Sequence, residues 1–94
     1  MNILVIAEVS VPRLRSGVKL QFDRRRDRWV VQAPERLFVP DEIALEILKR
    51  CDGQASVRVI VDDLAQSFQA PRTEILGDVL ELLKDLAEKG VIAS

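Results

Sequence analysis

The sequence predicts a small α+β domain resembling a winged helix-turn-helix, with a three-stranded antiparallel sheet followed by a three-helix bundle. Apolar residues alternate with polar ones in several runs up to about residue 40, and afterwards recur at every third or fourth position. With 94 residues, of which 48% are hydrophobic, the chain can bury one core but not two. We therefore expect a single domain that folds without help.

Two runs of alternating residues, 18–22 and 29–33, predict a β-hairpin joined by the polar segment 23–27. A third run, residues 36–39, is short and has a proline close to each end. Proline cannot donate a ladder hydrogen bond, so this run is expected at the edge of the sheet. Such an edge strand could offer unpaired backbone groups to a partner.

Helical periodicity begins at Asp41, where the first predicted helix starts, and this helix ends at Asp52-Gly53. Ser56 is a favourable N-cap for the second helix. The third is predicted to begin with Pro71 in its first turn and to end near Lys89.

The third predicted helix carries two apolar ridges instead of one. One ridge consists of Ile75, Val79, Leu82 and Leu86, and the other of Leu76, Leu80, Leu83 and Ala87. Together they cover roughly 160° of the helix, whereas one side of a small core needs only about 100°. Two interpretations stay open: one ridge faces a partner, or the strands cover both.

Several classes of catalytic and metal site lack the residues they need. The chain contains no histidine, and its single cysteine, Cys51, follows Ile47 and Leu48 at helical spacing, which favours a packed thiol. Asp62 and Asp63 diverge by about 100° on a helix and are expected on a solvated face. We therefore predict a non-catalytic binding module with no metal and no cofactor.

Charge is divided unevenly along the chain. Residues 1–40 contain eight Lys and Arg against four Asp and Glu, and residues 41–94 contain six against eleven. The run Arg24, Arg25 and Arg26 lies in the predicted hairpin turn, where it is either a solvated turn or an electrostatic rim for an acidic partner.

A DNA-binding role is the main rival because the predicted fold resembles a winged helix. The third helix would then read the DNA, yet its polar face is mostly acidic and would repel phosphates. The acidic residues on that face are Glu74, Asp78, Glu81, Asp85 and Glu88.

An edge strand beside a broad apolar helix favours peptide binding instead. An extended peptide could add to the Arg36–Val39 edge and bury side chains against Leu76, Leu80 and Leu83. A few ladder bonds and two or three apolar anchors, less the cost of ordering the peptide, give an affinity around micromolar.

Short motifs over about residues 11–93 resemble, in their order and spacing, the PqqD family of pyrroloquinoline quinone (PQQ) biosynthesis. They are Pro12-Arg13-Leu14, Gly17-Val18-Lys19-Leu20, Ala33-Pro34-Glu35-Arg36, Ile47-Leu48, Cys51-Asp52-Gly53, Ser56-Val57, Ile60-Val61, Ala70-Pro71-Arg72, Asp78-Val79 and Lys89-Gly90-Val91.

This resemblance implies a cytoplasmic peptide chaperone with no cofactor, no nucleic-acid partner and no membrane partner. It would bind the precursor peptide PqqA and present it to the radical SAM enzyme PqqE, which crosslinks a glutamate to a tyrosine in the peptide. The implied fold is the RiPP recognition element. The implied pairing edge is Arg36, Leu37, Phe38 and Val39, and the implied facing wall is Leu76, Val79, Leu80 and Leu83.

The chain departs from the family pattern in two places. Pro40 cannot donate a hydrogen bond to an added strand, which affects the peptide register. The N-terminal segment, residues 1–11, contains the apolar stretch Ile3–Val11 and could pair as an extra strand, within the chain or across a homodimer, while residues 12–94 form the recognition domain. A recognition domain for a different ribosomal peptide pathway stays the alternative function.

Overall fold

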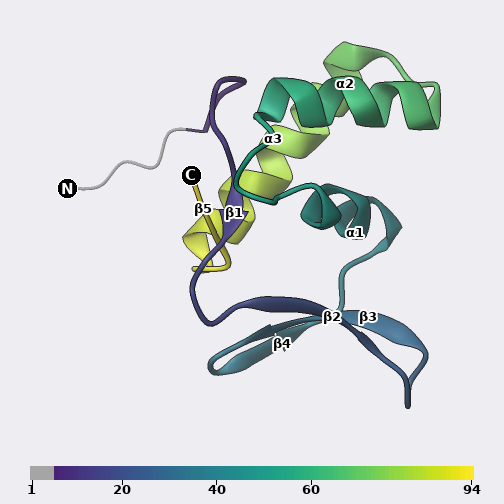
Figure 1. Cartoon of the computed structure of the whole chain (residues 1–94). Helices are drawn as coiled ribbons and strands as arrows, with labels where there is room; N and C mark the ends of the chain where they lie inside the picture. Colours follow the sequence, from purple (N-terminus) through teal and green to yellow (C-terminus); the bar gives the residue numbers. More distant parts are fainter. Residues whose placement is uncertain (1–5) are drawn as a thin grey trace.

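The computed structural model describes residues 6–94, so residues 3–5 of the predicted N-terminal strand lie outside the described residues. Figure 1 shows a small sheet on one side of the molecule and three helices on the other. In chain order the elements are β1 (Arg13–Leu14), β2 (Lys19–Asp23), β3 (Arg28–Ala33), β4 (Arg36–Phe38), α1 (Glu42–Lys49), α2 (Val57–Phe68), α3 (Arg72–Glu88) and β5 (Ile92–Ala93).

The predicted three-stranded antiparallel sheet is confirmed, in the order β2-β3-β4. In the turn between β2 and β3, the Asp23 carboxylate accepts hydrogen bonds from the backbone N–H groups of Arg25 and Arg26, at 3.0 and 3.3 Å. Asp27 then takes a left-handed conformation with φ 52°, which Asp tolerates better than most residues. The polar segment therefore forms the tight turn that the hairpin needs.

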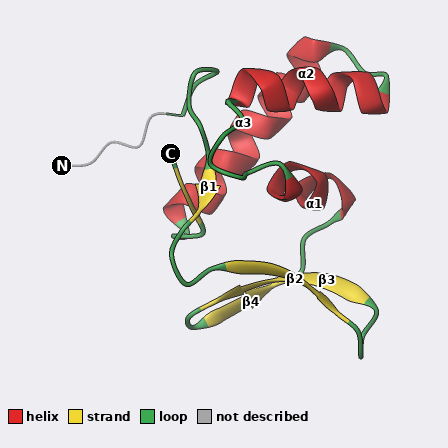
Figure 2. Ribbon diagram, viewed as in Figure 1, coloured by secondary structure: helices red, strands yellow, loops and turns green. Residues whose placement is uncertain are grey.

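A second sheet, of β1 and β5, was not predicted. Arg13 pairs with Ala93 and Leu14 with Ile92, so the two-residue strands join the two ends of the domain. Strands this short contain no alternation that a sequence pattern could reveal. Figure 2 shows the pair apart from the larger sheet, at the C-terminal end of α3.

The three helices begin at side-chain caps or at a proline. The Asp41 carboxylate accepts from the Ala44 N–H at 2.8 Å, and the Ser56 hydroxyl accepts from the Val59 N–H at 3.3 Å. Pro71 occupies the N-cap position of α3, one residue before the place predicted for it. The third helix ends before Gly90, as predicted, and this glycine has φ 76°.

Residues 6–11 form a turn and irregular structure, so within one chain the described part of the predicted extra strand is not a strand. Their carbonyl groups instead meet the start of α2, where Ser10 accepts from the Val57 N–H at 2.8 Å and Glu8 from the Arg58 N–H at 2.9 Å. These bonds satisfy two of the donors that a helix N-terminus leaves free. Ile6 is buried, which anchors the segment.

The core lies between the helices and the inner face of the sheet. Its side chains that are at most 1% exposed are Val31, Ile47, Val57, Ile60, Val61, Val79, Leu83, Val91 and Ile92. Most of them lie on α2 and α3 or at the C-terminus, so the helical part of the molecule contributes the larger share of the apolar burial. No helix in residues 6–94 has the length and apolarity needed to cross a membrane.

Candidate peptide-binding site

β4 is an edge strand, as the flanking prolines predicted. In the three-stranded sheet it pairs only with β3, and its other edge has no neighbouring strand within residues 6–94. The strand spans three residues, so Val39 of the predicted pairing edge lies just beyond its end. An exposed edge can accept an added strand through its free N–H and C=O groups.

The register shows which residue of β4 offers those groups. Ala33 pairs with Arg36 across a two-residue turn, and Gln32 pairs with Leu37. A two-residue hairpin turn is closed by a hydrogen-bonded pair, and the next pair along the ladder is not hydrogen-bonded. The N–H and C=O of Leu37 therefore point away from β3, toward the free edge.

The ladder ends at Phe38, and Val39 and Pro40 lie beyond it. A continued alternation would direct the backbone groups of Val39 to the free edge and place Pro40 toward β3, the side that an added strand does not use. Leu37 is therefore the residue of β4 best placed to pair with a peptide, and pairing through Val39 stays a prediction.

Side chains of β4 alternate between the two faces of the sheet. Phe38 packs against the hydrophobic core, whereas Leu37 and Val39 expose 53% and 52% of their surface. Leu37 lies beside Gln32 on the outer face, and Arg36 is exposed at the turn. The side chains of an added strand would therefore lie beside Leu37 and Val39 on the outer face of the sheet, and toward the hydrophobic core on the inner face.

The predicted facing wall on α3 divides into two parts. Val79 and Leu83 are 1% and 0% exposed, so they are core residues and offer no surface to a peptide in this structure. Leu76 and Leu80 are only partly buried against the core. The residues at the centre of the helix's apolar surface face the domain interior, which the sequence pattern alone could not decide.

A groove lies on the other flank of α3, between this helix and α1; we call it the α1–α3 groove. It consists of two adjoining hollows of about 540 and 420 Å³. The first is lined by Asp41, Ile43, Ala44, Ile47, Asp78, Glu81, Leu82 and Asp85. The second is lined by Glu42, Ile43, Ile47, Leu64, Phe68, Ala70, Glu74, Ile75, Asp78 and Val79.

Sequence reasoning missed this groove. Ile43 is not among the apolar residues whose spacing was used for the first helix, Ile47, Leu48 and Cys51. Leu82 was assigned to a ridge of the third helix but not to the facing wall. One available signal was the spacing of Glu74 and Asp78, which places two carboxylates on the same side of α3. Their apolar neighbour in that turn, Ile75, shows that the flank is mixed and not simply solvated.

The predicted electrostatic rim is accessible. Arg24, Arg25 and Arg26 are all exposed in the turn between β2 and β3, and only Arg26 forms an ion pair there, with Asp23 at 3.6 Å. Their exposure agrees equally with a solvated turn, so the role of the arginines in binding stays a prediction.

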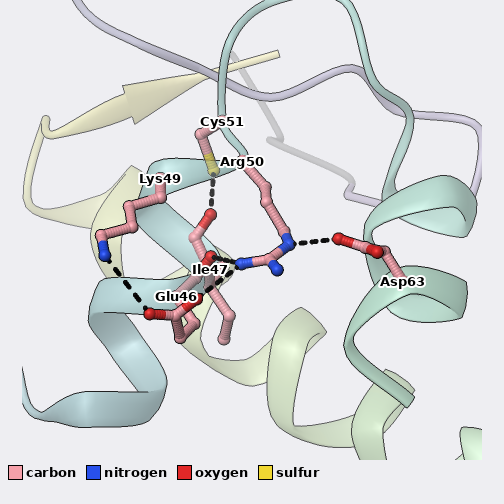
Figure 3. A network of polar contacts seen from close by, with 6 residues as sticks. All are labelled: Glu46, Ile47, Lys49, Arg50, Cys51 and Asp63. Carbon is pink, nitrogen blue, oxygen red and sulfur yellow. Dashed lines mark hydrogen bonds and ion pairs between the residues drawn. The ribbon is translucent and has the colours of Figure 1, made fainter. Parts of the chain in front are cut away.

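A polar network fastens α1 to α2 (Figure 3). Arg50 donates to the Asp63 carboxylate at 2.6 Å and to the Glu46 carboxylate at 2.9 Å. These bonds raise the pKa of Arg50, with Asp63 the larger cause, and the bond from Arg50 is the main cause that lowers the pKa of Glu46. Each partner stabilises the charged form of the other, as expected of a structural ion pair.

Cys51 belongs to the core, as its spacing predicted. Its Sγ donates to the Ile47 carbonyl at 3.3 Å, as Figure 3 shows, and burial raises the pKa of the thiol to about 12, with a smaller contribution from Asp52. A thiol with so high a pKa is not a nucleophile near neutral pH. In residues 6–94 no group of three or more Cys, Asp and Glu side chains is arranged to hold a metal ion.

Relatives of known name resemble the chain over most of its length. A "PqqA binding protein" of Rhodopseudomonas palustris (strain BisB5) is 49% identical over 95% of this chain and 87% of its own length. Another "PqqA binding protein", of Gluconobacter oxydans (strain 621H), is 49% identical over 94% of this chain and 92% of its own.

Two solved structures share the fold. The solution structure of the PqqD truncation of Methylobacterium extorquens PqqCD, a stand-alone RiPP recognition element, has a TM-score of 0.81 with 39% identity and 96% of both chains covered. The crystal structure of PqqD from Xanthomonas campestris has a TM-score of 0.56 with 47% identity, covering 90% of this chain and 94% of that one. The family model of coenzyme PQQ synthesis protein D (PqqD) matches residues 28–92. The chain belongs to the PqqD family.

Proposed function

We propose that this chain is a peptide chaperone of PQQ biosynthesis that binds the precursor peptide PqqA at the free edge of β4. The observation that carries the proposal is the register of the β3–β4 hairpin, which directs the N–H and C=O of Leu37 away from the sheet. Membership of a family whose relatives are named PqqA binding proteins supports the choice of cargo.

Binding by strand addition suits a carrier that must release its cargo. β4 is short, so an added strand gains only a few backbone hydrogen bonds, each contributing roughly 0.5–1.5 kcal/mol. Apolar contacts with exposed Leu37 and Val39 add to these bonds, and ordering the peptide subtracts about 2–5 kcal/mol. These contributions are small and partly cancel, so we expect an affinity around micromolar or weaker.

We further propose that the domain performs no catalysis itself and presents bound PqqA to the radical SAM enzyme PqqE. The buried Cys51 supports this assignment because its thiol cannot act as a nucleophile, and the chain has no histidine to act as a base. The exposed run Arg24–Arg26 is a surface through which an acidic partner could dock.

Isothermal titration calorimetry with synthetic PqqA tests the cargo, with a scrambled peptide of the same composition as control. We expect PqqA to bind with an affinity around micromolar and the scrambled peptide at least about tenfold more weakly. Equal binding of the two peptides would show that the cargo is not recognised by its sequence. Gel filtration of the chain with PqqA and PqqE then tests whether a ternary complex forms.

We also propose that residues 1–11 can pair as a strand with the same segment of a second copy, forming a homodimer. In the described part, residues 6–11 are engaged with α2 within the same chain, which gives the monomer its own place for the segment. Light scattering at several protein concentrations, before and after removal of residues 1–11, would measure whether the segment drives dimerisation.

A further inference from the structure

The α1–α3 groove combines an apolar surface with an open mouth. Its two hollows share Ile43, Ile47 and Asp78, so they form one continuous depression along α3. Two of its apolar side chains are unusually accessible, since Ile43 is 53% and Phe68 41% exposed. Side chains of this kind lining a concave surface can hold an apolar anchor from a bound segment.

The charges around the groove all have one sign. Of the residues in 6–94, six carboxylates and no Lys or Arg line the two hollows, the six being Asp41, Glu42, Glu74, Asp78, Glu81 and Asp85. Among residues 6–94, only Asp85 of these six forms an ion pair, with Lys89 at 2.9 Å. Carboxylates elsewhere on α1 and α2 have partners: Glu46 and Asp63 bind Arg50, and Asp62 binds Arg72. The groove is therefore complementary to a segment that carries positive charge beside apolar side chains.

The groove begins where the candidate pairing edge ends. β4 ends at Phe38, and Asp41, which caps α1, also lines the first hollow. Figure 1 shows the short link that leads from β4 up to α1. Only residues 39 and 40 separate the end of β4 from Asp41, so the candidate pairing edge and the first hollow are close along the chain.

We propose that the precursor peptide continues from the edge of β4 into the α1–α3 groove and binds there through a basic segment with an apolar anchor. The apolar side chain packs on Ile43 and Phe68, and Lys or Arg side chains of the peptide face Glu74 and Asp78. This inference rests on the proposed function, because it extends the binding of PqqA to a second contact surface. In this proposal the groove recognises positive charge on the peptide. Backbone pairing with a short edge strand cannot supply that recognition.

The test measures the affinity for synthetic PqqA of the wild-type chain and of groove variants. The double variant Glu74→Gln/Asp78→Asn removes two carboxylates, Ile43→Ala removes an apolar contact, and Glu88→Gln on the exposed face of the same helix is the matched control. We expect the double variant to bind about 3- to 10-fold more weakly, Ile43→Ala to bind more weakly as well, and the control to bind unchanged. Raising the salt concentration should weaken the binding of PqqA to the wild-type chain. The difference in affinity between the wild-type chain and the double variant should then become smaller.

Amide chemical shifts recorded during the same titrations separate the two proposals. Movement at residues 37 and 39 together with residues 43, 74 and 78 supports the groove proposal. Movement at 37 and 39 alone, with normal affinity of the groove variants, would overturn it and leave the proposed function intact. No movement in either region would overturn the proposed function itself. If the double variant instead abolishes only self-association of the chain, the occupant is the arginine-rich turn of a second copy, and the peptide assignment is wrong.

Discussion

The α2–α3 pair and the edge strand β4 differ in how much of their apolar surface the fold covers. Val57, Val61 and Leu83 are fully buried, whereas Leu37 and Val39 expose about half of theirs. The backbone N–H groups in the first turn of α2 are also all hydrogen-bonded. The Ser56 hydroxyl accepts from one of them, and the carbonyls of Glu8 and Ser10 accept from two others. If β4 is the peptide-binding edge, as proposed, stability and recognition reside in different parts of the molecule, and substitutions should affect one without the other.

Core truncation tests this separation with the largest expected effect. Leu83→Ala removes a fully buried side chain from α3 and should lower the free energy of unfolding by about 2–5 kcal/mol. Leu37→Ala, on the half-exposed edge strand, should change it by no more than about 0.5 kcal/mol. Urea unfolding followed by circular dichroism measures both, and similar losses for the two variants would contradict the separation.

The edge strand should show the opposite behaviour in a binding assay. Leu37→Pro removes the N–H that points to the free edge, and we expect it to weaken PqqA binding about tenfold or more. Leu37→Ala keeps that N–H and is the matched control, with a smaller loss from the missing apolar contact. Unchanged affinity of the proline variant, with its unfolding transition intact, would place the peptide elsewhere.

Much of the fold followed from sequence because each element carries its own local signal. The alternation in residues 18–22 and 29–33, the helix start at Asp41, the cap Ser56 and the stop at Gly90 all appear in the structure, whereas α1 ends at Lys49, before the predicted Asp52-Gly53. β1 and β5 escaped prediction because two-residue strands have no period and their pairing depends on contacts between the ends of the chain.

The candidate site was predictable only in part. Proline close to both ends identified the edge strand, because a proline cannot donate a ladder hydrogen bond and is therefore rare in a central strand. For the predicted wall on α3, two apolar ridges leave the rotation of the helix undetermined from sequence. The structure places Val79 and Leu83 in the core and leaves Leu76 and Leu80 partly exposed, so contact of the wall with a peptide stays a prediction. The α1–α3 groove depends on how the fold places α1 and α2 beside α3, which no local pattern encodes.

The ion pairs of Arg50 should contribute less to stability than the buried core and are the next test of the helical part of the molecule. Arg50→Gln removes ion pairs to Glu46 and Asp63, and because these groups are partly exposed we expect a loss of about 1 kcal/mol or less at neutral pH. The pKa of Glu46 is lowered in the folded chain, so its stabilisation is present above the ordinary value of 4.5 and is lost as the pH falls through the lowered pKa.

Acidification should therefore reduce the difference between the wild-type chain and Arg50→Gln. Urea unfolding of both at neutral pH and at about pH 3 measures this difference. A difference that grows on acidification would contradict the assigned ion pair.

Cys51 gives the smallest expected effect. With burial raising its pKa to about 12, the thiol should resist iodoacetamide in the folded chain at neutral pH and react readily once urea unfolds the chain. Mass spectrometry of samples taken over time distinguishes the two rates. Rapid alkylation of the folded chain would mean that the thiol is accessible, and would reopen the question of a chemical role.

Hydrogen exchange at β4 tests most directly the claim that PqqA adds to the sheet through Leu37 and Val39. Amide exchange of the chain, followed by NMR with and without saturating PqqA, resolves these N–H groups individually. We predict that the Leu37 and Val39 amides gain protection on binding, while the Phe38 amide, already directed toward β3, changes little. If PqqA binds and the Leu37 amide exchanges as fast as before, strand addition at β4 is wrong.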